Sequence, residues 1–500
     1  MKKCRPIMVQ ATCSHAGKSV LTAALLRILK HRGFKAAPFK AQNMALNSAV
    51  TRSGHEIGRA QAFQAEAAGI EATSDMNPIL LKPTGDAVSQ VIIHGKVFGS
   101  MSAREYHSFK KEAKRFVAES YERLSAEYEV IVIEGAGSPA EVNLRDNDIA
   151  NMGIAEMCDA PVILAGDIDR GGVFAHLVGT LDLLTPAERE RVKGFVINKF
   201  RGDIGLLKPG LEFLEARTKK PVLGVVPYFK EMLLPDEDGV ALDSNEPAGA
   251  SAVTIAVIRL PRISNFTDFD PFRAEVVNLK YIESPEGIEG ADAVIIPGTK
   301  NTVSDLAWLK DKGFFEKLRS FRERGGVIFG VCGGFQMLGS EVRDPFGMES
   351  TKATEAGLAF LDCTTTILEH KKTFNVRASL EFDGNSFDAS GYEIHMGETK
   401  GSLKPFSRIS ERNGEGVEVL DGGADGTVFG TYIHGIFDND AFRRAFLDML
   451  PGKKGLPARA QTSFAAKRNE ALDKWAALVE KSVKIDEIMK IMGLKPECLT

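Results

Sequence analysis

The stretch from Gly325 to Gly339, which reads GGVIFGVCGGFQMLG, constrains the fold more than any other part of the chain. Its apolar run at 327–329 predicts a β-strand, and apolar side chains at helical spacing from 335 to 338 predict a helix directly after it. A glycine-rich turn joins the two. The sequence therefore predicts an α/β unit in which a strand turns sharply into a helix at the edge of a sheet.

Cys332 lies in the middle of this turn, in the pattern G-x-C-x-G. Flanking glycines let two backbones approach closely while a nucleophile takes a strained position at the sheet edge. A helix N-terminus favours thiolate over thiol, and the N–H of Gly333 can point at an oxyanion. Cys332 is therefore the candidate nucleophile and Gly333 a candidate oxyanion-hole donor. The alternative is a buried, inert cysteine in a glycine-rich turn.

Two histidines are candidates for the base that a cysteine nucleophile requires. An imidazole must take the thiol proton and later return it to the leaving amine. His434 directly follows a predicted strand at 427–432, whereas His395 lies in a more irregular segment, GYEIHMG. Spacing alone does not choose between them, and we favour His434 for its place at a strand end. Gly298, in the turn after the predicted strand 293–296, is the candidate second oxyanion donor.

A second strand, loop and helix lie near the N-terminus. An apolar run at 6–9 is followed by QATCSHAGKS and an amphipathic run at 20–29. Backbone N–H groups of such a loop cradle phosphate, its lysine reaches the terminal phosphates, and its serine hydroxyl can ligate Mg²⁺. The strict pattern has glycine where Thr12 stands, so the loop is a variant. The candidate nucleotide-binding residues in it are Thr12, Gly17, Lys18 and Ser19.

Further predicted strands in this half alternate with helical stretches, which indicates a doubly wound parallel sheet. These strands are predicted at 130–133, 161–165, 194–197 and 221–228. Nucleotide sites form at the carboxyl edge of such sheets. Glu134, at the end of one strand, is the candidate second Mg²⁺ ligand, and the alternative is a strand-end carboxylate facing water. Asn198 and Lys199, at the end of another, are candidates to contact the nucleotide base.

Polar residues are dense in two further stretches, 39–48 and 75–83. Prolines near both ends of the second predict a loop or an edge segment. Polar loop residues in such number suggest a large polar ligand, although a solvated loop explains each one singly. The candidate substrate-region residues are Gln42, Asn43, Asp75, Asn77, Lys82 and Asp146.

The 500 residues divide into two α/β halves and a tail. The segment 242–251, LDSNEPAGAS, is rich in small and polar residues and marks a boundary. We predict a phosphate-loop domain at 1–245, a second α/β domain at 251–450, and a helical tail at 451–500 that serves packing.

Composition excludes several classes of protein. A net charge of -4 provides no basic field for nucleic acid. The six cysteines form no C-x-x-C pairs, which argues against a zinc site or a disulfide framework. The chain contains no cleavage pattern after its N-terminal lysines and no run of 18 apolar residues. We expect a cytoplasmic protein with small-molecule partners and no membrane association.

Several motifs together resemble the cobyric acid synthase family, the glutamine-dependent amidotransferases of cobalamin biosynthesis. They cover nearly the whole chain and read AGKS, QNMALNS, EIGRAQ, DMNPILLKP, EGAGSPAE, DIDRGGVFA, LPRISNFTDFD, PGTKNT, GVCGGFQMLG and GYEIHMGE. The resemblance implies an N-terminal ATP-dependent amidoligase domain of the dethiobiotin-synthetase type, joined to a class I glutamine amidotransferase domain. It implies Cys332 as the glutaminase nucleophile and His434 as its base.

The chain departs from the family pattern at three positions. Ala11 and Ala41 stand where the family usually has glycine and proline, and the first change could crowd the phosphate turn. Most class I glutaminases carry glutamate two residues after the histidine, where this chain has Ile436. This is the pattern of the cobyrinate amidotransferase branch, so the resemblance implies a catalytic dyad of Cys332 and His434 without a third acidic member.

The implied reaction uses ATP, Mg²⁺, glutamine and a corrinoid. The b, d, e and g carboxylates of adenosylcobyrinic acid a,c-diamide would be phosphorylated and then amidated, which yields adenosylcobyric acid. Alternatives are the a,c-diamide synthase, an amidase for another polyacid, a partition-type switch ATPase and a regulatory glutamine-binding module. Cys13 stands where switch ATPases have their signature lysine, and the presence of Cys332 disfavours the regulatory module. The oligomeric state and the path of ammonia stay open.

Overall fold

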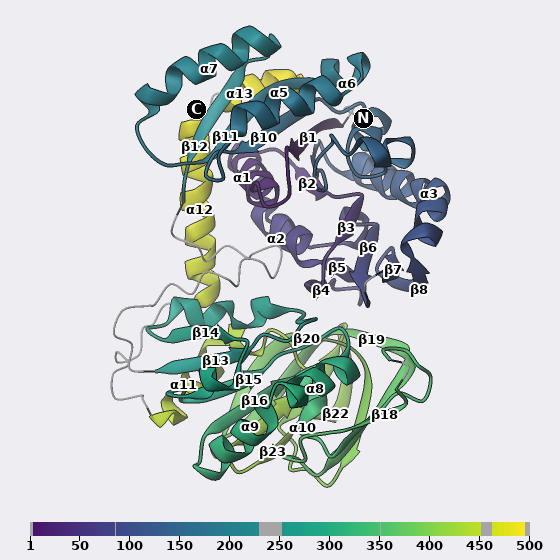
Figure 1. Ribbon diagram of the computed structural model, residues 1–500, viewed down its shortest axis with the longest axis vertical. Coiled ribbons are helices and arrows are strands. Elements are labelled where there is room, and N and C mark those ends of the chain that lie inside the picture. The colour runs from purple at the N-terminus through teal and green to yellow at the C-terminus, as the bar shows by residue number, and fades with distance from the viewer. Residues whose placement is uncertain (1–3, 86, 230–252, 351, 452–462, 496–500) are drawn as a thin grey trace.

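A computed structural model describes residues 4–85, 87–229, 253–350, 352–451 and 463–495. Figure 1 shows two lobes, a purple-to-teal upper lobe from the first half of the chain and a green lower lobe from the second half. The last helices, in yellow, return to the upper lobe. The predicted boundary at 242–251 lies outside the described residues.

The upper lobe is built on a six-stranded sheet of order β12-β11-β10-β1-β9-β2. All neighbouring strands in it are parallel. The strands are β1 (Arg5–Ala11), β2 (Ala36–Phe39), β9 (Val130–Glu134), β10 (Val162–Asp167), β11 (Val192–Phe200) and β12 (Val222–Pro227). The predicted doubly wound parallel sheet is confirmed. Its strands are near-continuous apolar runs because helices cover both faces.

Helices on the two faces of this sheet bury alternate residues of each strand. Ile7 and Val9 pack toward one face, while Met8 packs toward the other. The helices are α1 (Lys18–His31), α2 (Arg59–Ala68), α3 (Ala103–Glu127), α4 (Met152–Met157), α5 (Val173–Leu183), α6 (Pro186–Arg191) and α7 (Ile204–Thr218). The C-terminal helices α12 (Phe464–Ser482) and α13 (Ile485–Ile491) join α1 on its face, where the Trp475 indole N–H donates to the Val20 carbonyl at 2.8 Å.

A smaller four-stranded sheet and a two-stranded hairpin complete the upper lobe. The sheet order is β3-β6-β7-β8, from β3 (Gln42–Met44), β6 (Ile79–Pro83), β7 (Val88–Ile93) and β8 (Lys96–Ser102). The expectation of a loop or edge segment at 75–83 is wrong, because β6 lies between β3 and β7. Pro78 and Pro83 fall just before the strand and at its last residue, where they interrupt no central pairing. The hairpin pairs β4 (Ser48–Val50) with β5 (Glu56–Gly58).

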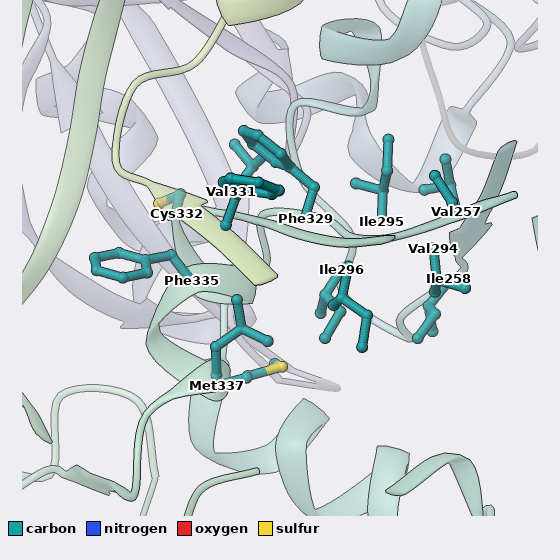
Figure 2. Packing of buried hydrophobic residues seen from close by; sticks show 14 of the residues in the cluster. Val257, Ile258, Val294, Ile295, Ile296, Phe329, Val331, Cys332, Phe335 and Met337 are labelled. Atoms are coloured by element: carbon teal, nitrogen blue, oxygen red, sulfur yellow. The ribbon is translucent and has the colours of Figure 1, made fainter. Parts of the chain in front are cut away.

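The lower lobe has a second, mainly parallel sheet of order β14-β13-β15-β16-β24-β23, with β23 antiparallel at its edge. The strands are β13 (Thr254–Ile258), β14 (Asn278–Ile282), β15 (Ala293–Ile296), β16 (Val327–Val331), β23 (Gly423–Asp425) and β24 (Val428–Thr431). In Figure 2, Val257, Ile295 and Phe329 lie on one face of these strands. Ile258, Val294 and Ile296 lie on the other, as the two-residue period of a strand requires.

The helices of this lobe are α8 (Thr302–Asp311), α9 (Phe314–Glu323), α10 (Gly333–Leu338) and α11 (Asp440–Met449). Short 3₁₀ helices are η4 (Phe266–Ala274), η5 (Pro285–Ile288) and η6 (Ile436–Asp438); in the upper lobe they are η1 (Ser74–Met76) and η2 (Val142–Asn147). No helix in the described parts of the chain is long and apolar enough to cross a membrane.

A third sheet of the lower lobe is mainly antiparallel and contains two long strands. It comprises β17 (Glu341–Arg343), β18 (Thr354–Ala356), β19 (Cys363–Phe382), β20 (Asn385–Gly401), β21 (Ser407–Arg412) and β22 (Glu415–Asp421). The segment of His395, expected to be irregular, lies within β20. Its glycines at 391 and 397 obscure the strand pattern in the sequence.

Candidate active site

The turn that holds the candidate nucleophile Cys332 joins β16 to α10, the strand–turn–helix geometry that the sequence predicts. Its backbone has φ 51° and ψ -108°, a left-handed, strained conformation for a residue with a side chain. The Cys332 N–H donates to the Thr431 carbonyl at 2.8 Å, which ties the turn to β24. A methyl group at Gly334 would overlap the carbonyl oxygen of Ile296, so this turn closes only with glycine there.

His434 follows β24 and is held by a carboxylate from a distant part of the sequence. Its Nδ1 lies 2.6 Å from Oδ2 of Asp268, in η4, and the Gly435 N–H donates to the other oxygen of Asp268 at 3.0 Å. His434 is 1 % exposed and Asp268 is 3 % exposed. The second ring nitrogen, Nε2, is buried and meets no partner in full hydrogen-bond geometry among the described residues, while the Cys332 side chain interacts with the ring.

The charges around His434 favour its protonated form. Burial by itself lowers the pKa of His434, but the negative charges of Asp268 and Cys332 outweigh it and raise the pKa to about 10. Tyr392 stacks on the ring, with centroids 5.2 Å apart. His434 is therefore suited to hold a proton beside the Cys332 sulfur.

The two predicted oxyanion donors lie around this turn. Gly333 is the first residue of α10, so its N–H has no acceptor within that helix. A Cβ at Gly333 would lie 3.1 Å from the Thr299 nitrogen, and a Cβ at Gly298 would lie 3.1 Å from Cε1 of His434. The loop after β15 thus passes close to both the turn and the histidine.

His395, the alternative base, has other partners. Its Nδ1 lies 2.7 Å from the Gly397 carbonyl oxygen and its Nε2 lies 3.5 Å from Glu393. The ring stacks on Tyr432 with centroids 3.9 Å apart. Arg412 donates to both oxygens of Glu393, at 2.8 and 2.9 Å. These contacts hold His395 between neighbouring residues of β20 and Tyr432, and they favour His434 as the base.

Further buried polar groups near Cys332 were not found from the sequence. Gln336 accepts from the Thr302 hydroxyl at 2.8 Å, and the Thr302 N–H donates to Glu349 at 2.6 Å. Burial raises the pKa of Glu349 to about 7, although the charge of Lys300 lowers it. Burial and the charge of Lys82 lower the pKa of Lys300.

The phosphate loop brings its predicted residues together with Glu134. Gly17 has φ 90° and precedes α1, and Lys18 donates to the carbonyls of Cys13 and Gly137, each at 3.1 Å. The Ser19 hydroxyl donates to Oε1 of Glu134 at 2.8 Å. The end of β9 and the start of α1 therefore meet at one point of the sheet edge.

Two residues that the sequence analysis did not select also contact Glu134. Lys40 Nζ lies 2.7 Å from Oε1, and Gln64 Nε2 donates to Oε2 at 2.5 Å. Both are buried, as is Glu134. No group of three or more His, Cys, Asp or Glu residues suited to a metal occurs in the described ranges. Mg²⁺ bound with a nucleotide needs only one or two protein oxygens beside phosphate and water, so the paired oxygens of Ser19 and Glu134 fit it.

The end of β11 lies against the phosphate loop. Asn198 Nδ2 donates to the Ala16 carbonyl at 2.8 Å, and Lys199 Nζ donates to the His15 carbonyl at 2.6 Å. Lys199 also pairs with Asp167 at 2.8 Å. Thr12, at the start of the loop, donates its N–H to the Ala165 carbonyl at 3.0 Å, and its hydroxyl has no described partner.

The predicted substrate-region residues are spread over the upper lobe. Asn43 and Asn77 lie together at Gly58, where a Cβ would come within 2.6 Å of the first and 3.0 Å of the second. Gln42 accepts from the Tyr106 hydroxyl at 2.7 Å, whereas Asp75 pairs with Arg123 of α3 at 2.6 Å. Asp146 is exposed on η2. Their role in substrate binding stays a prediction.

Lys82 lies at the contact between the lobes. It pairs with buried Glu56 of β5 at 2.8 Å, and Lys371 of β19 reaches the same carboxylate at 2.5 Å. Burial would raise the pKa of Glu56, but the two lysines outweigh it and lower the pKa below its usual range. Burial lowers the pKa of Lys371 to about 7, against the charge of Glu56.

Asp268 and Lys40 are the main site residues that sequence reasoning missed. Asp268 belongs to the quoted motif LPRISNFTDFD, but its partner His434 is 166 residues away. Lys40 precedes the amide-rich stretch and is 94 residues from Glu134. Each pairing depends on how strands are ordered in space, and no spacing in the chain indicates it.

Two family models match the chain. Residues 7–239 match a CobQ/CobB/MinD/ParA nucleotide binding domain, and residues 254–442 match a CobB/CobQ-like glutamine amidotransferase domain. Similar proteins named cobyric acid synthase include one from Sorangium cellulosum, 50% identical over 98% of each chain. Another, from Clostridium botulinum, is 48% identical over 98% of this chain and 99% of its own. A third, from Thermoanaerobacter sp., is 48% identical over 97% of this chain and 98% of its own.

Proposed function

The chain belongs to the cobyric acid synthase family, and we propose that it amidates the b, d, e and g carboxylates of adenosylcobyrinic acid a,c-diamide with glutamine and ATP. The product is adenosylcobyric acid. The observation that carries this proposal is the buried His434 beside Cys332, facing a lobe that holds a phosphate loop. One site can release ammonia and the other can activate a carboxylate.

The glutaminase half of the reaction is assigned to the lower lobe. The thiol proton of Cys332 is transferred to His434, whose surroundings favour its protonated form, and the Cys332 thiolate attacks the carboxamide carbon of glutamine. The N–H groups of Gly333 and Gly298 stabilise the oxyanion. As the C–N bond breaks, His434 returns the proton to the departing nitrogen, which leaves as ammonia. Water then attacks the thioester with His434 as base, and glutamate and the free thiol are restored.

The amidation half is assigned to the upper lobe. A carboxylate oxygen of the corrinoid attacks the γ-phosphorus of ATP, ADP leaves, and an acyl phosphate results. Ammonia then attacks the acyl carbon and phosphate leaves, which gives the amide. Lys18 would hold the transferred phosphoryl group, and Asn198 and Lys199 would contact the nucleotide base.

Ser19 and Glu134 would hold Mg²⁺, which neutralises phosphate charge when bound. Lys40 and Gln64 fix the Glu134 carboxylate for this role. Gln42, Asn43, Asp75, Asn77, Lys82 and Asp146 remain candidates for contacts with the corrinoid. We place the reaction in the cytoplasm and expect no nucleic-acid partner, in keeping with the net charge of -4.

The test is mass spectrometry of the corrinoid after incubation with the protein, ATP, Mg²⁺ and glutamine labelled with ¹⁵N in its side-chain amide. Four labelled nitrogens in the product are expected. If glutamine is hydrolysed but no label enters the corrinoid, the proposed substrate is wrong, while the assignment of a two-domain amidotransferase still holds. Incorporation only into cobyrinic acid that lacks the a and c amides would indicate the a,c-diamide synthase instead.

A further inference from the structure

We propose that Asp268 positions His434 in the glutaminase centre, and that the upper lobe holds Asp268 in place through Asn47 and Ser48 at the start of the β4–β5 hairpin. The inference rests on the proposed glutaminase function and adds to it a positioning residue and its support from the other lobe.

The contacts of Asp268 fix both its own carboxylate and the histidine. One oxygen meets Nδ1 of His434 at 2.6 Å and the other accepts the Gly435 N–H at 3.0 Å. With Nδ1 donating to the carboxylate, Nε2 is the nitrogen left to exchange a proton with sulfur. Ile436, at the position where most class I glutaminases carry an acid, cannot do this. Asp268 of η4 therefore has the orienting role that, in most class I glutaminases, belongs to an acid two residues after the histidine.

The start of η4 is held by a reciprocal pair of hydrogen bonds from the upper lobe. The Phe266 N–H donates to Oδ1 of Asn47 at 3.1 Å, and the Ser48 N–H donates to Oδ1 of Asn265 at 3.0 Å. The Asn265 carbonyl in turn accepts the Asp268 N–H at 3.0 Å. All five residues are buried. Unpaired, these polar groups would each cost free energy, so the pairing specifies one position for η4.

Ser48 also contacts Tyr392, the residue that stacks on the His434 ring. Its carbonyl accepts the Tyr392 hydroxyl at 3.1 Å, and the Tyr392 ring stacks on His434. Tyr392 and His434 further exchange backbone hydrogen bonds at 2.8 and 3.1 Å. Ser48 thus contacts both segments that flank the imidazole.

Arg59, directly after β5, brings a positive charge to the same place. It interacts electrostatically with Tyr392, Asp438 and Asp268. Asp268 and Cys332 of the lower lobe raise the pKa of His434, and Arg59 of the upper lobe interacts with the same Asp268. Glutamine cleavage would in this way depend on contact with the lobe that consumes ammonia.

The first experiment replaces Asp268 in the full-length protein. Asp268→Asn should lower the kcat of glutamine hydrolysis by roughly 10²–10⁴-fold, since the amide no longer orients and charges the imidazole. The KM for glutamine should change far less. Asp268→Glu should restore part of the rate. The pH profile of Cys332 alkylation by iodoacetamide should shift to higher pH in Asp268→Asn, a change that lost stability alone would not produce.

The second experiment tests the support from the upper lobe. Asn47→Ala and Asn265→Ala each remove one bond of the reciprocal pair, and each should lower kcat by about 10-fold, with the same direction of alkylation shift. Thr373→Val is the matched control, because it removes the 2.7 Å bond to the Gly54 carbonyl across the same lobe contact without touching η4. It should leave kcat unchanged. Thermal unfolding identifies any variant that is not folded.

Three outcomes would overturn the inference. They are normal kcat and alkylation in Asp268→Asn, normal kcat in both asparagine variants, or equal losses in the asparagine variants and Thr373→Val. A wild-type protein that releases no ammonia from glutamine would instead contradict the proposed function.

Discussion

The phosphate loop and the cysteine turn are both strand–turn–helix units, yet they are assembled differently. The loop draws Gly17, Lys18 and Ser19 from consecutive positions, and its other partners come from strand ends of the same parallel sheet. The cysteine turn depends on His434 from one segment, Asp268 from another and Asn47 from the other lobe. We therefore expect the phosphate loop to keep its geometry if the lobes separate, and the cysteine turn to lose the support of Asn47.

Replacing the proposed nucleophile should give the largest difference between the activities of the two sites. Cys332→Ala should reduce glutamine-supported amidation by roughly 10⁴-fold or more, because the thioester cannot form. Amidation supported by free ammonia should persist, and product formation with each nitrogen source is the measurement.

Cys363→Ala is the control for this variant, since burial raises the pKa of Cys363 to about 11 and keeps its thiol protonated. Loss of activity with both nitrogen sources in Cys332→Ala would indicate a structural role for that thiol.

Removing the loop lysine should affect both nitrogen sources alike. Lys18→Ala should lower ATP-dependent amidation by roughly 10²–10³-fold with glutamine or with ammonia, because neither reacts with an unactivated acid. The control is Lys193, an exposed lysine on β11, and Lys193→Ala should behave like wild type. Retained activity in Lys18→Ala with either source would contradict the assignment of the loop.

Gly334, in the cysteine turn, should contribute to the stability of the fold. In Gly334→Ala the new methyl group would meet the rigid carbonyl of Ile296, and we expect a loss of about 1–3 kcal/mol in the free energy of unfolding. In Gly416→Ala the methyl group meets nothing within 4 Å, and stability should change little. Urea unfolding of both variants measures the difference, and equal stability would show that the turn can relax.

The smallest expected effect is a pH dependence of the free energy of unfolding, caused by Glu349 near the cysteine turn. The pKa of Glu349 is about 7 in the folded protein against 4.5 for an ordinary glutamate. Between these values the folded state binds more protons than the unfolded chain, so this group makes stability fall as pH rises from 4.5 to 7. Urea midpoints across this window should fall less steeply in Glu349→Gln than in wild type. An identical slope would contradict the raised pKa.

The sequence by itself determined the two α/β units, the turn around Cys332 and the loop around Lys18. Each follows from apolar periods, glycines and a functional residue within about twenty neighbouring positions, because local backbone geometry requires those residue types. It also predicted most strands of both parallel sheets. In the other two sheets, prolines hid the interior strand β6 and glycines hid β20.

Only the tertiary structure decided which acid orients His434, which lysine neutralises Glu134, and how the hairpin of one lobe meets the active centre of the other. Asp268, Lys40 and Asn47 are ordinary polar residues in the sequence. Their partners lie 166, 94 and 219 residues away. A hydrogen bond depends on distance in space, and strand order and lobe contact set that distance independently of spacing along the chain.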